Sequence, residues 1–482
     1  MSTPRGLPSP LFVLFPLLVA CGGGGGGEDG TTFVGTFTTT SITTTEAREG
    51  TVRFDGEPVE ALVERAGGGW DRVPGEARAE GGFRITGLPA SGPIVVHFVN
   101  EYFYTSARTL DFSVASLGRG GLRQASSPTP ITFSGTGMSA WSEGDELELI
   151  AFDSGVVGDA LQKLAASAPT PGSAQLSLTW DHAKLTSSFL VQGEVQVAHL
   201  ATFLTGESVP YRAIESVARV SGVTMADGLP LALDGTFVPV SGATTRLDAT
   251  WSRSAFDRFQ SLAHPKADQG VAALEVFALP RAAQFGPYRR GAKLAAAMPG
   301  EGVTDTPVSF EFTNPWEGTD LYAEASVVYA RGYGLDGKER TDIKCGVSVT
   351  DELAAFTGEL TPRIGPPRTL TLDGADARDD LSGLGETPRL EWQPPSFGTA
   401  DQYVVAVWRL GTNATQTTKT RIAMLYTQDT AVRLPPGLLT AGDRFFVQVI
   451  ALSSPRSSLA TKPYARSFPV SYGAAVSGVL SR

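Results

Sequence analysis

The sequence is poor in cysteine and histidine, and this scarcity excludes several kinds of site. Cys21 and Cys345 are the only two cysteines among 482 residues, too few for a framework of several disulfides. The four histidines are His97, His182, His199 and His264. They never lie three or four residues apart, so the local spacing typical of a zinc site is missing. We therefore expect no metal and no cofactor.

The chain also lacks the local motifs that carry most catalytic chemistry. It has no G-x-S-x-G elbow, because the stretch GMSAW at Gly137–Trp141 lacks the second glycine. S-x-x-K pairs, Walker loops and dinucleotide-binding loops are missing as well. We therefore predict no catalytic residues and a protein that is not an enzyme.

Clusters of basic charge are missing too. The net charge is −11, and the longest run of basic residues is the pair Arg289–Arg290. Such a chain lacks the cluster of positive charge that would attract the phosphates of a nucleic acid or an anionic lipid surface. We expect no nucleic-acid partner.

The longest apolar run is the ten-residue stretch at Leu11–Ala20. A membrane-spanning helix needs about 20 apolar residues, so this run is typical of the apolar region of a signal peptide. Leu18-Val19-Ala20-Cys21 resembles the bacterial lipobox, and the resemblance implies cleavage after residue 20 and a diacylglycerol thioether on Cys21. The alternative is an ordinary secretory signal with an incidental cysteine.

The lipobox resemblance implies a place in the bacterial cell envelope, with the membrane as a partner through the lipid. Two or more acyl chains anchor a protein stably, whereas one does so only marginally. Gly22, and not an aspartate, follows the cysteine, which resembles the outer-membrane sorting pattern if the organism has two membranes.

Residues 21–47 follow as a glycine-rich and then threonine-rich segment, for which we predict a flexible tether. The stretch FVGTF and the threonine run leave a first strand open as the alternative. With 55 glycines and 32 prolines, the rest of the chain suits many short strands separated by turns.

Segment 48–125 alternates short apolar runs with glycine-containing turns. Its motif positions are Gly50, Asp55, Gly56, Pro58, Val59, Ala61, Gly82, Phe83, Gly87, Leu88 and Pro89. In this order they resemble the carboxypeptidase regulatory-like (transthyretin-like) β-sandwich, which implies a fold and no reaction.

Segment 366–482 carries a second resemblance. Leu390 and Trp392 precede a Pro-Pro pair, Tyr403, Val405 and Val407 alternate along one strand, and Phe445 opens another. This order is similar to a fibronectin type III domain. That family usually has tyrosine at the position of Phe445, and the tyrosine hydroxyl bonds to the backbone of the corner. Phenylalanine lacks this hydroxyl, so we expect the packing of the ring to be kept and the hydrogen bond to be lost.

The middle segment, 126–365, resembles no family. Alternating stretches such as DELELIAF, TRLDATW and AALEVFAL predict strands, in one large or two ordinary β domains, with a break near 236–250 or 296–306. The predicted fold class is therefore all-β: tandem antiparallel β-sandwiches after a signal peptide at residues 1–20 and a tether.

Acidic clusters are the remaining candidate sites. Asp373, Asp376, Asp379 and Asp380, with Glu386 nearby, supply closely spaced oxygens of the kind calcium prefers. Their spacing departs from that of an EF-hand, so a solvated loop is the alternative.

A second acidic stretch contains Glu143, Asp145, Glu146 and Glu148, which could supply paired carboxylates for glycoside hydrolysis. Strand alternation instead points Leu147 and Leu149 inward and leaves the acids on a wet face.

Two other residue types allow a functional and a structural interpretation. Cys345, with alternating apolar neighbours, suits a small buried side chain better than a nucleophile. The seven tryptophans favour core positions over a sugar-stacking platform.

These patterns predict a lipid-anchored envelope protein of tandem β-sandwiches that binds or scaffolds without catalysis. Its ligand would be a protein or a carbohydrate of the envelope. The alternative is a hydrolase acting on polysaccharide or peptide, with its site in the middle segment.

Overall fold

The computed structural model describes residues 31–52, 54, 58–66, 68–165, 169–203, 209–281, 291–297 and 305–482. The predicted signal peptide, Cys21 and the first part of the tether lie outside these ranges. The described residues form 33 β-strands, three short α-helices and three 3₁₀ turns, so the predicted all-β class is confirmed. No helix in the described ranges is both long and apolar enough to cross a membrane.

The first unit is a two-layer sandwich. Its strands are β1 (Phe33–Thr36), β4 (Val59–Glu64), β5 (Trp70–Ala77), β6 (Phe83–Ile85), β7 (Ile94–Phe98), β8 (Glu101–Thr105) and β9 (Thr109–Asp111). One layer has the order β9-β1-β6-β5 and the other β5-β4-β7-β8, since β5 pairs with β4 along one half and with β6 along the other. Between the layers lies an aromatic core that includes Phe33, Phe83, Phe98 and Phe112.

The predicted tether is wrong for its second part, because residues 33–42 form strands. Strand β1 lies between β6 and β9, antiparallel to the former and parallel to the latter. Phe33 is fully buried and stacks on Phe83 with ring centroids 6.0 Å apart. The partner strands come 50 to 75 residues later in the chain, so local composition, which is rich in glycine and threonine, did not signal this burial.

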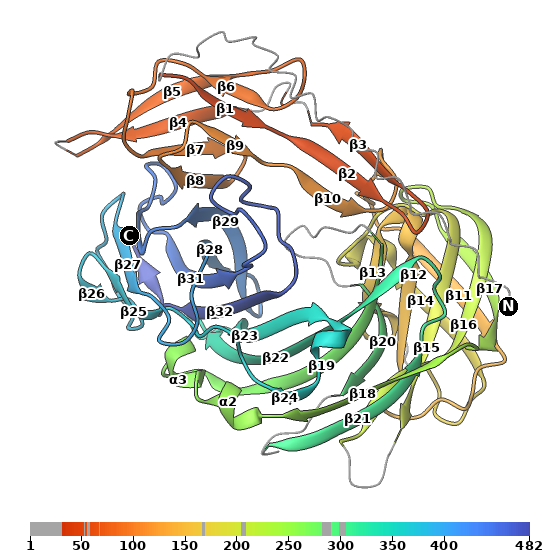
Figure 1. Cartoon of the computed structure of the whole chain (residues 1–482). Coiled ribbons are helices and arrows are strands. Elements are labelled where there is room, and N and C mark those ends of the chain that lie inside the picture. Colours follow the sequence, from red (N-terminus) through yellow and green to blue (C-terminus); the bar gives the residue numbers. More distant parts are fainter. Residues whose placement is uncertain are drawn as a thin grey trace, which may run out of the picture.

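A three-stranded sheet, here called the arm, extends from the first sandwich to the second unit (Figure 1). It consists of β3 (Ala47–Thr51), β2 (Thr38–Ile42) and β10 (Val114–Leu117). At its far end, the Gly118 amide donates to Ile42 O at 2.7 Å and the Arg119 amide donates to Asp153 O at 2.9 Å. The arm is therefore hydrogen-bonded to the unit that it reaches.

The middle segment contains two cores. The second unit has strands β11 (Pro130–Thr136), β12 (Glu146–Ala151), β13 (Val156–Ala160), β14 (Gln175–Asp181), β15 (Gln192–Phe203), β16 (Tyr211–Thr224) and β17 (Leu231–Pro239), with η1 (Phe152–Ser154), α1 (Leu161–Leu164) and η2 (His182–Lys184). The layer β14-β11-β17 faces the layer β13-β12-β15-β16 over a core that includes Phe133, Leu147 and Val197.

Four residues separate the end of β17 from the first strand of the third unit. It comprises β18 (Thr244–Trp251), α2 (Arg253–Asp257), α3 (Gln260–Ala263), β19 (Asp268–Pro280), β20 (Ala292–Ala297), β21 (Thr306–Thr313), β22 (Thr319–Tyr333), β23 (Thr341–Glu352), η3 (Leu353–Ala355) and β24 (Gly358–Leu360). The layer β21-β18-β24 and the sheet β20-β19-β22-β23 enclose Trp251, Phe310 and Tyr329.

The C-terminal unit is again a sandwich. Its layers are β26 (Ala375–Asp376), β25 (Arg368–Leu372), β27 (Arg389–Gln393) and β30 (Ala431–Arg433), against β29 (Thr417–Thr427), β28 (Gln402–Thr412), β31 (Arg444–Ser453), β32 (Val470–Val476) and β33 (Leu480–Ser481). The alternating residues singled out in the sequence, among them Leu390, Trp392, Tyr403 and Phe445, meet in its core.

The four units are joined by hydrogen-bonded pairing between strands of different units. Strand β8 of the first sandwich pairs in parallel with β29 of the last, β32 pairs with β23, and β20 pairs with β16. The units consequently follow one another around a ring, and the last returns to the first (Figure 1). Within the described ranges most strand pairs are antiparallel, and five are parallel.

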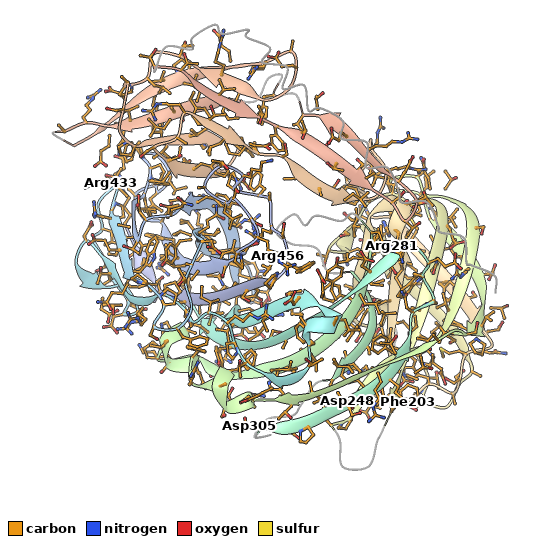
Figure 2. The ribbon with its side chains drawn as sticks, viewed as in Figure 1. Phe203, Asp248, Arg281, Asp305, Arg433 and Arg456 are labelled. Carbon is orange, nitrogen blue, oxygen red and sulfur yellow. The ribbon has the colours of Figure 1, made fainter. Side chains whose placement is uncertain are left out.

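Side chains reinforce the seam where the ring returns to its beginning. Arg433, labelled in Figure 2, forms an ion pair with Glu64 at 2.9 Å, and its carbonyl accepts the Tyr104 hydroxyl at 2.6 Å. Tyr426, from the last sandwich, stacks on Phe103 of the first with ring centroids 4.7 Å apart. The first and last sandwiches thus share one hydrophobic core.

Candidate functional site

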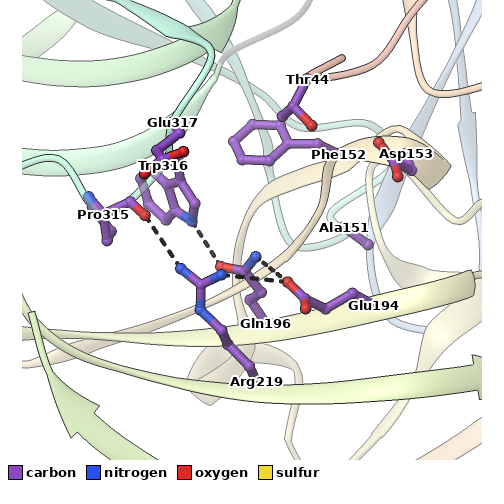
Figure 3. A pocket seen from close by; sticks show the side chains of 10 residues that line it. All are labelled: Thr44, Ala151, Phe152, Asp153, Glu194, Gln196, Arg219, Pro315, Trp316 and Glu317. Carbon is purple, nitrogen blue, oxygen red and sulfur yellow. Dashed lines mark hydrogen bonds and ion pairs between the residues drawn. The ribbon is translucent and has the colours of Figure 1, made fainter. Parts of the chain in front are cut away.

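A hollow of about 320 Å³ lies where the arm meets the second and third units (Figure 3). The arm supplies Thr44, in the turn between β2 and β3. The third unit supplies the loop between β21 and β22, with Trp316 and Glu317. The hollow therefore exists only when three separate parts of the chain are assembled.

Strands β15 and β16 form the side of the hollow that belongs to the second unit. Glu194 and Gln196 are two residues apart on β15, so the pleat points both to the same face. Arg219 lies directly opposite Gln196 on β16. Beside them, η1 ends at Gly155, whose φ of 67° closes the turn that holds Asp153 near the hollow.

An asparagine turn holds the tryptophan in place. The Asn314 side chain accepts the Trp316 amide at 3.0 Å and donates to the Thr319 hydroxyl at 2.9 Å, and that hydroxyl donates to Trp316 O at 2.8 Å. Gly318 follows with φ of 73°, and a Cβ there would lie 2.6 Å from Thr44 O. Glycine thus permits the close approach of the loop to the arm.

The floor of the hollow is buried and its rim is charged. Trp316 packs edge to face on Phe152, with ring centroids 5.7 Å apart, and its Nε1 donates to Gln196 Oε1 at 2.7 Å. Gln196 Nε2 in turn donates to Glu194 Oε1 at 2.6 Å. These bonds fix the orientation of the indole and the amide, and so create a preformed surface.

Three carboxylates and one guanidinium surround this floor. Arg219 donates to Pro315 O at 3.2 Å and lies 3.7 Å from Glu194. Asp153, Glu194 and Glu317 are all exposed, and all three line the hollow (Figure 3). With three acids against one base, the lining carries a net negative charge.

The predicted wet face is wrong for three of the four acids, because Asp145, Glu146 and Glu148 are buried and only Glu143 is exposed. Leu147 and Leu149 are buried as expected, but Glu146 and Glu148 are only 3% and 0% exposed. Lys293 on β20 reaches both, with Nζ 2.6 Å from Glu146 and 3.5 Å from Glu148. Strand β12 is therefore buried on both faces, because β20, almost 150 residues later, covers the second face.

Two further residues complete this ionic cluster. Glu275 lies 3.6 Å from Lys293 Nζ, and Arg212 donates to Glu146 at 2.7 Å. Burial raises the pKa of Glu148, and the neighbouring carboxylates raise it further, against the effect of Lys293. Burial would lower the pKa of Lys293, but the three carboxylates outweigh it and hold that pKa above its usual value. Of the two carboxyl groups on β12, Glu148 thus keeps a proton more readily than Glu146, whose pKa is lowered by Lys293 and Arg212.

A series of polar side-chain contacts runs from the surface into the core of the second unit. The Ser139 hydroxyl donates to Glu215, Glu215 lies 3.4 Å from His199 Nδ1, and His199 Nε2 lies 3.2 Å from Asp145. Trp141 stacks on the imidazole, whose ring centroid is 5.7 Å away. Because His199 is fully buried, this series of contacts anchors the 137–145 segment rather than offering an imidazole to a substrate.

The other three histidines have structural partners. His97 stacks on Tyr102 with ring centroids 4.1 Å apart, and His182 Nε2 lies 2.7 Å from Phe189 O. His264 accepts an amide on Nδ1, and burial lowers its pKa to about 4. These contacts give the three histidines structural roles.

The predicted calcium ligands are exposed and held by separate local bonds. Asp373 accepts the Arg389 amide, Asp376 pairs with Arg378 at 2.6 Å, and Asp380 accepts the Val479 amide. Asp379 is exposed beside them. Among the described residues no three acidic, histidine or cysteine side chains are grouped to hold a metal ion.

Cys345 and five of the seven tryptophans occupy the expected core positions, whereas Trp70 and Trp408 are only partly buried. Cys345 is a free, buried cysteine, and burial raises the pKa of its thiol to about 12. Five tryptophans are buried: Trp141, Trp180, Trp251, Trp316 and Trp392. Trp316 alone among these five lines the described hollow.

Sequence reasoning did not find the hollow. Its residues come from four regions, near 44, 152, 194–219 and 316, and none of these regions carries a motif. The nearest local signal is the N-P-W-E-G stretch at 314–318, in which asparagine and glycine are turn formers on either side of a tryptophan.

Comparisons with known proteins add little to this geometry. No protein-family model matches the chain, and no curated protein matches it. The solved tetra-tandem repeat in the extending region of a large adhesion protein aligns at 14% identity over 92% of this chain and 99% of that one, with a TM-score of 0.12. A leucine-rich repeat protein from Bacteroides thetaiotaomicron VPI-5482 aligns at 10% identity over 48% of this chain and 25% of that one, with a TM-score of 0.09. At these scores the alignments do not bear on its function.

Proposed function

We propose that this chain is an envelope protein, anchored by a lipid on Cys21, that binds a ligand at the hollow between arm, second unit and third unit. The observation that carries the proposal is the hollow itself, with a preformed floor at Trp316 and Gln196 and a charged rim. Concave sites at the junction of units, with few fixed polar groups, are the usual form of a binding site.

The strand pairing between units supports a scaffolding role for the rest of the molecule. A binding site assembled from three units keeps its shape only if the units cannot swing apart, and the pairings of β8 with β29 and β32 with β23 oppose such motion. The sandwich resemblances at 48–125 and 366–482 agree with this role, since they imply folds without catalytic residues. The lipobox supplies the proposed attachment to the membrane.

Co-sedimentation tests the proposed function. Purified full-length protein is mixed with envelope material from which detergent has removed the lipid, so that the anchor does not contribute. We expect the wild type to sediment, and Glu317→Trp, which fills the hollow from an exposed loop position, to sediment about tenfold less. The control is Glu76→Trp, at an exposed position on β5 of the first sandwich. Equal sedimentation of wild type and Glu317→Trp would refute the site.

One observation favours the alternative, a hydrolase of the middle segment. Glu148 has a raised pKa next to two other carboxylates, and a carboxyl group that keeps its proton near neutral pH is what a general acid requires. Against it, Glu148 is fully buried, so substrate would reach it only after the cluster opens. Turnover of envelope polysaccharide or peptide that is lost in Glu148→Gln, while folding is retained, would establish the enzyme and end the purely scaffolding interpretation.

A further inference from the structure

We infer that the hollow takes an amino sugar with a free, protonated amino group. This inference rests on the proposed function and names the class of ligand for the same site. Three features of the lining carry it: the excess of carboxylates, the aromatic floor and the hydrogen-bonding groups between them.

The charge of the lining selects a cation. Asp153, Glu194 and Glu317 line the hollow against the single guanidinium of Arg219. Arg219 is already engaged, with Pro315 O at 3.2 Å and Glu194 at 3.7 Å. A ligand that brings one ammonium group offsets part of the excess negative charge, whereas an anionic ligand would add to it.

The position of the acids favours an organic cation over a metal ion. Within the described residues no three such side chains are close enough to share one metal, and the carboxylates come from three different segments around the rim. An ammonium group donates up to three hydrogen bonds in separate directions, and so suits dispersed acceptors better than a metal that needs a compact set of ligands.

The floor and the size favour a sugar ring as the carrier of that amine. Phe152 and Trp316 line the hollow with the small exposed part of their rings, which gives a pyranose ring carbon atoms to contact, and Gln196 and Thr44 line it with an amide and a hydroxyl. A volume of about 320 Å³ lies at the lower end of the range for small-ligand sites. A slender lysine side chain would leave much of this volume to water.

Calorimetric titration of the full-length protein in detergent tests the inference with matched probes. Glucosamine carries the ammonium group, N-acetylglucosamine replaces it with a neutral amide, and glucose replaces it with a hydroxyl. Nα-acetyl-lysine amide carries an ammonium group on a peptide-like scaffold. We expect glucosamine to bind at least tenfold more tightly than each of the other three.

Variants of the rim locate the binding. Glu317→Gln and Asp153→Asn each remove one negative charge from an exposed position, and we expect each to weaken glucosamine binding by about three- to tenfold. Glu76→Gln, the same change on the first sandwich, should leave the affinity unchanged. Salt at 1 M should weaken binding to the wild type more than to the rim variants, because exposed charges are screened.

The outcomes separate the ligand class from the site. Equal affinity for glucosamine and N-acetylglucosamine, or tighter binding of the lysine derivative, would overturn the amino-sugar inference. If envelope material is still retained in a Glu317-dependent way, the proposed binding function survives that result. If neither glucosamine nor envelope material depends on the rim residues, both proposals fail.

Discussion

Replacing Glu101 with glutamine tests how the first and last sandwiches are held together. Glu101 opens β8 and lies opposite Met424 in the parallel pairing with β29. Burial raises the pKa of its carboxyl from its ordinary value of 4.5 to about 7, and Arg421 offsets this only in part. Its Oε2 is buried and accepts no hydrogen bond from the described residues. The ionised form is therefore the costly one at this seam.

The size and sign of the effect follow from the two pKa values. Because the folded pKa is the higher, the folded protein keeps a proton between pH 4.5 and 7 that the unfolded chain has lost. The contribution of Glu101 to stability is complete below pH 4.5 and is lost as the pH rises to 7. At about 1.4 kcal/mol per tenfold change in proton affinity, the difference amounts to about 3 kcal/mol. Glutamine, which is neutral throughout, removes this pH dependence.

Hydrogen exchange at the seam measures the effect. The Met424 amide donates to Asn100 O at 2.9 Å across the two sandwiches, so its protection reports on their separation. Between pH 5 and 8, after correction for intrinsic exchange, we expect protection in the wild type to fall about 30- to 150-fold more than in Glu101→Gln. Other titrating groups cancel in this comparison, and Glu76→Gln serves as the control. Parallel losses in wild type and Glu101→Gln would refute the reasoning.

Further predictions concern the ionic cluster, the two cysteines and the last core. Lys293→Met leaves three carboxylates without their shared cation, and should destabilise the protein by about 3–5 kcal/mol at pH 8 and by less at pH 5; an equal loss at both pH values in urea unfolding would contradict this. Cys345 should resist a thiol reagent until urea unfolds the chain, since burial raises its thiol pKa to about 12; rapid labelling of native protein would disprove the burial. Phe445→Ala should cost about 3–5 kcal/mol in unfolding free energy because Phe445 is fully buried, and a cost below 1 kcal/mol would count against that packing. Cys21→Ser should move the protein out of the detergent phase in Triton X-114 partitioning, and unchanged partitioning would rule out the lipid anchor.

Local patterns predicted the parts of the fold that depend on neighbouring residues. Alternation placed Leu147 and Leu149 in the second core and Tyr403 and Val405 in the last, because a strand with one buried face shows a period of two. Apolar neighbours likewise marked Cys345 as a core residue. In each case the burial of the residue can be predicted without knowing which part of the chain covers it.

Long-range pairing defeated the same reasoning elsewhere. Period-two alternation left Glu146 and Glu148 on the outer face of β12, but Lys293 and Glu275 cover that face from strands more than 120 residues away. Composition assigned Phe33 to a tether, yet β9 and β6 enclose it. A buried charge and a buried glycine-rich strand can be recognised only once the covering partners are known.

The sequence by itself determined the all-β class and most core positions, because strand periodicity and turn residues act over a few residues. It also carried the prediction of a lipid anchor, since a signal peptide and its cleavage site are read locally. Only the tertiary structure decided that strands of neighbouring units pair, so that the four units form a ring. It also decided that β12 is covered on both faces and that Thr44, Gln196 and Trp316 meet at one hollow. These features depend on contacts between residues tens to hundreds of positions apart, and no local pattern in the chain encodes which distant segments will meet.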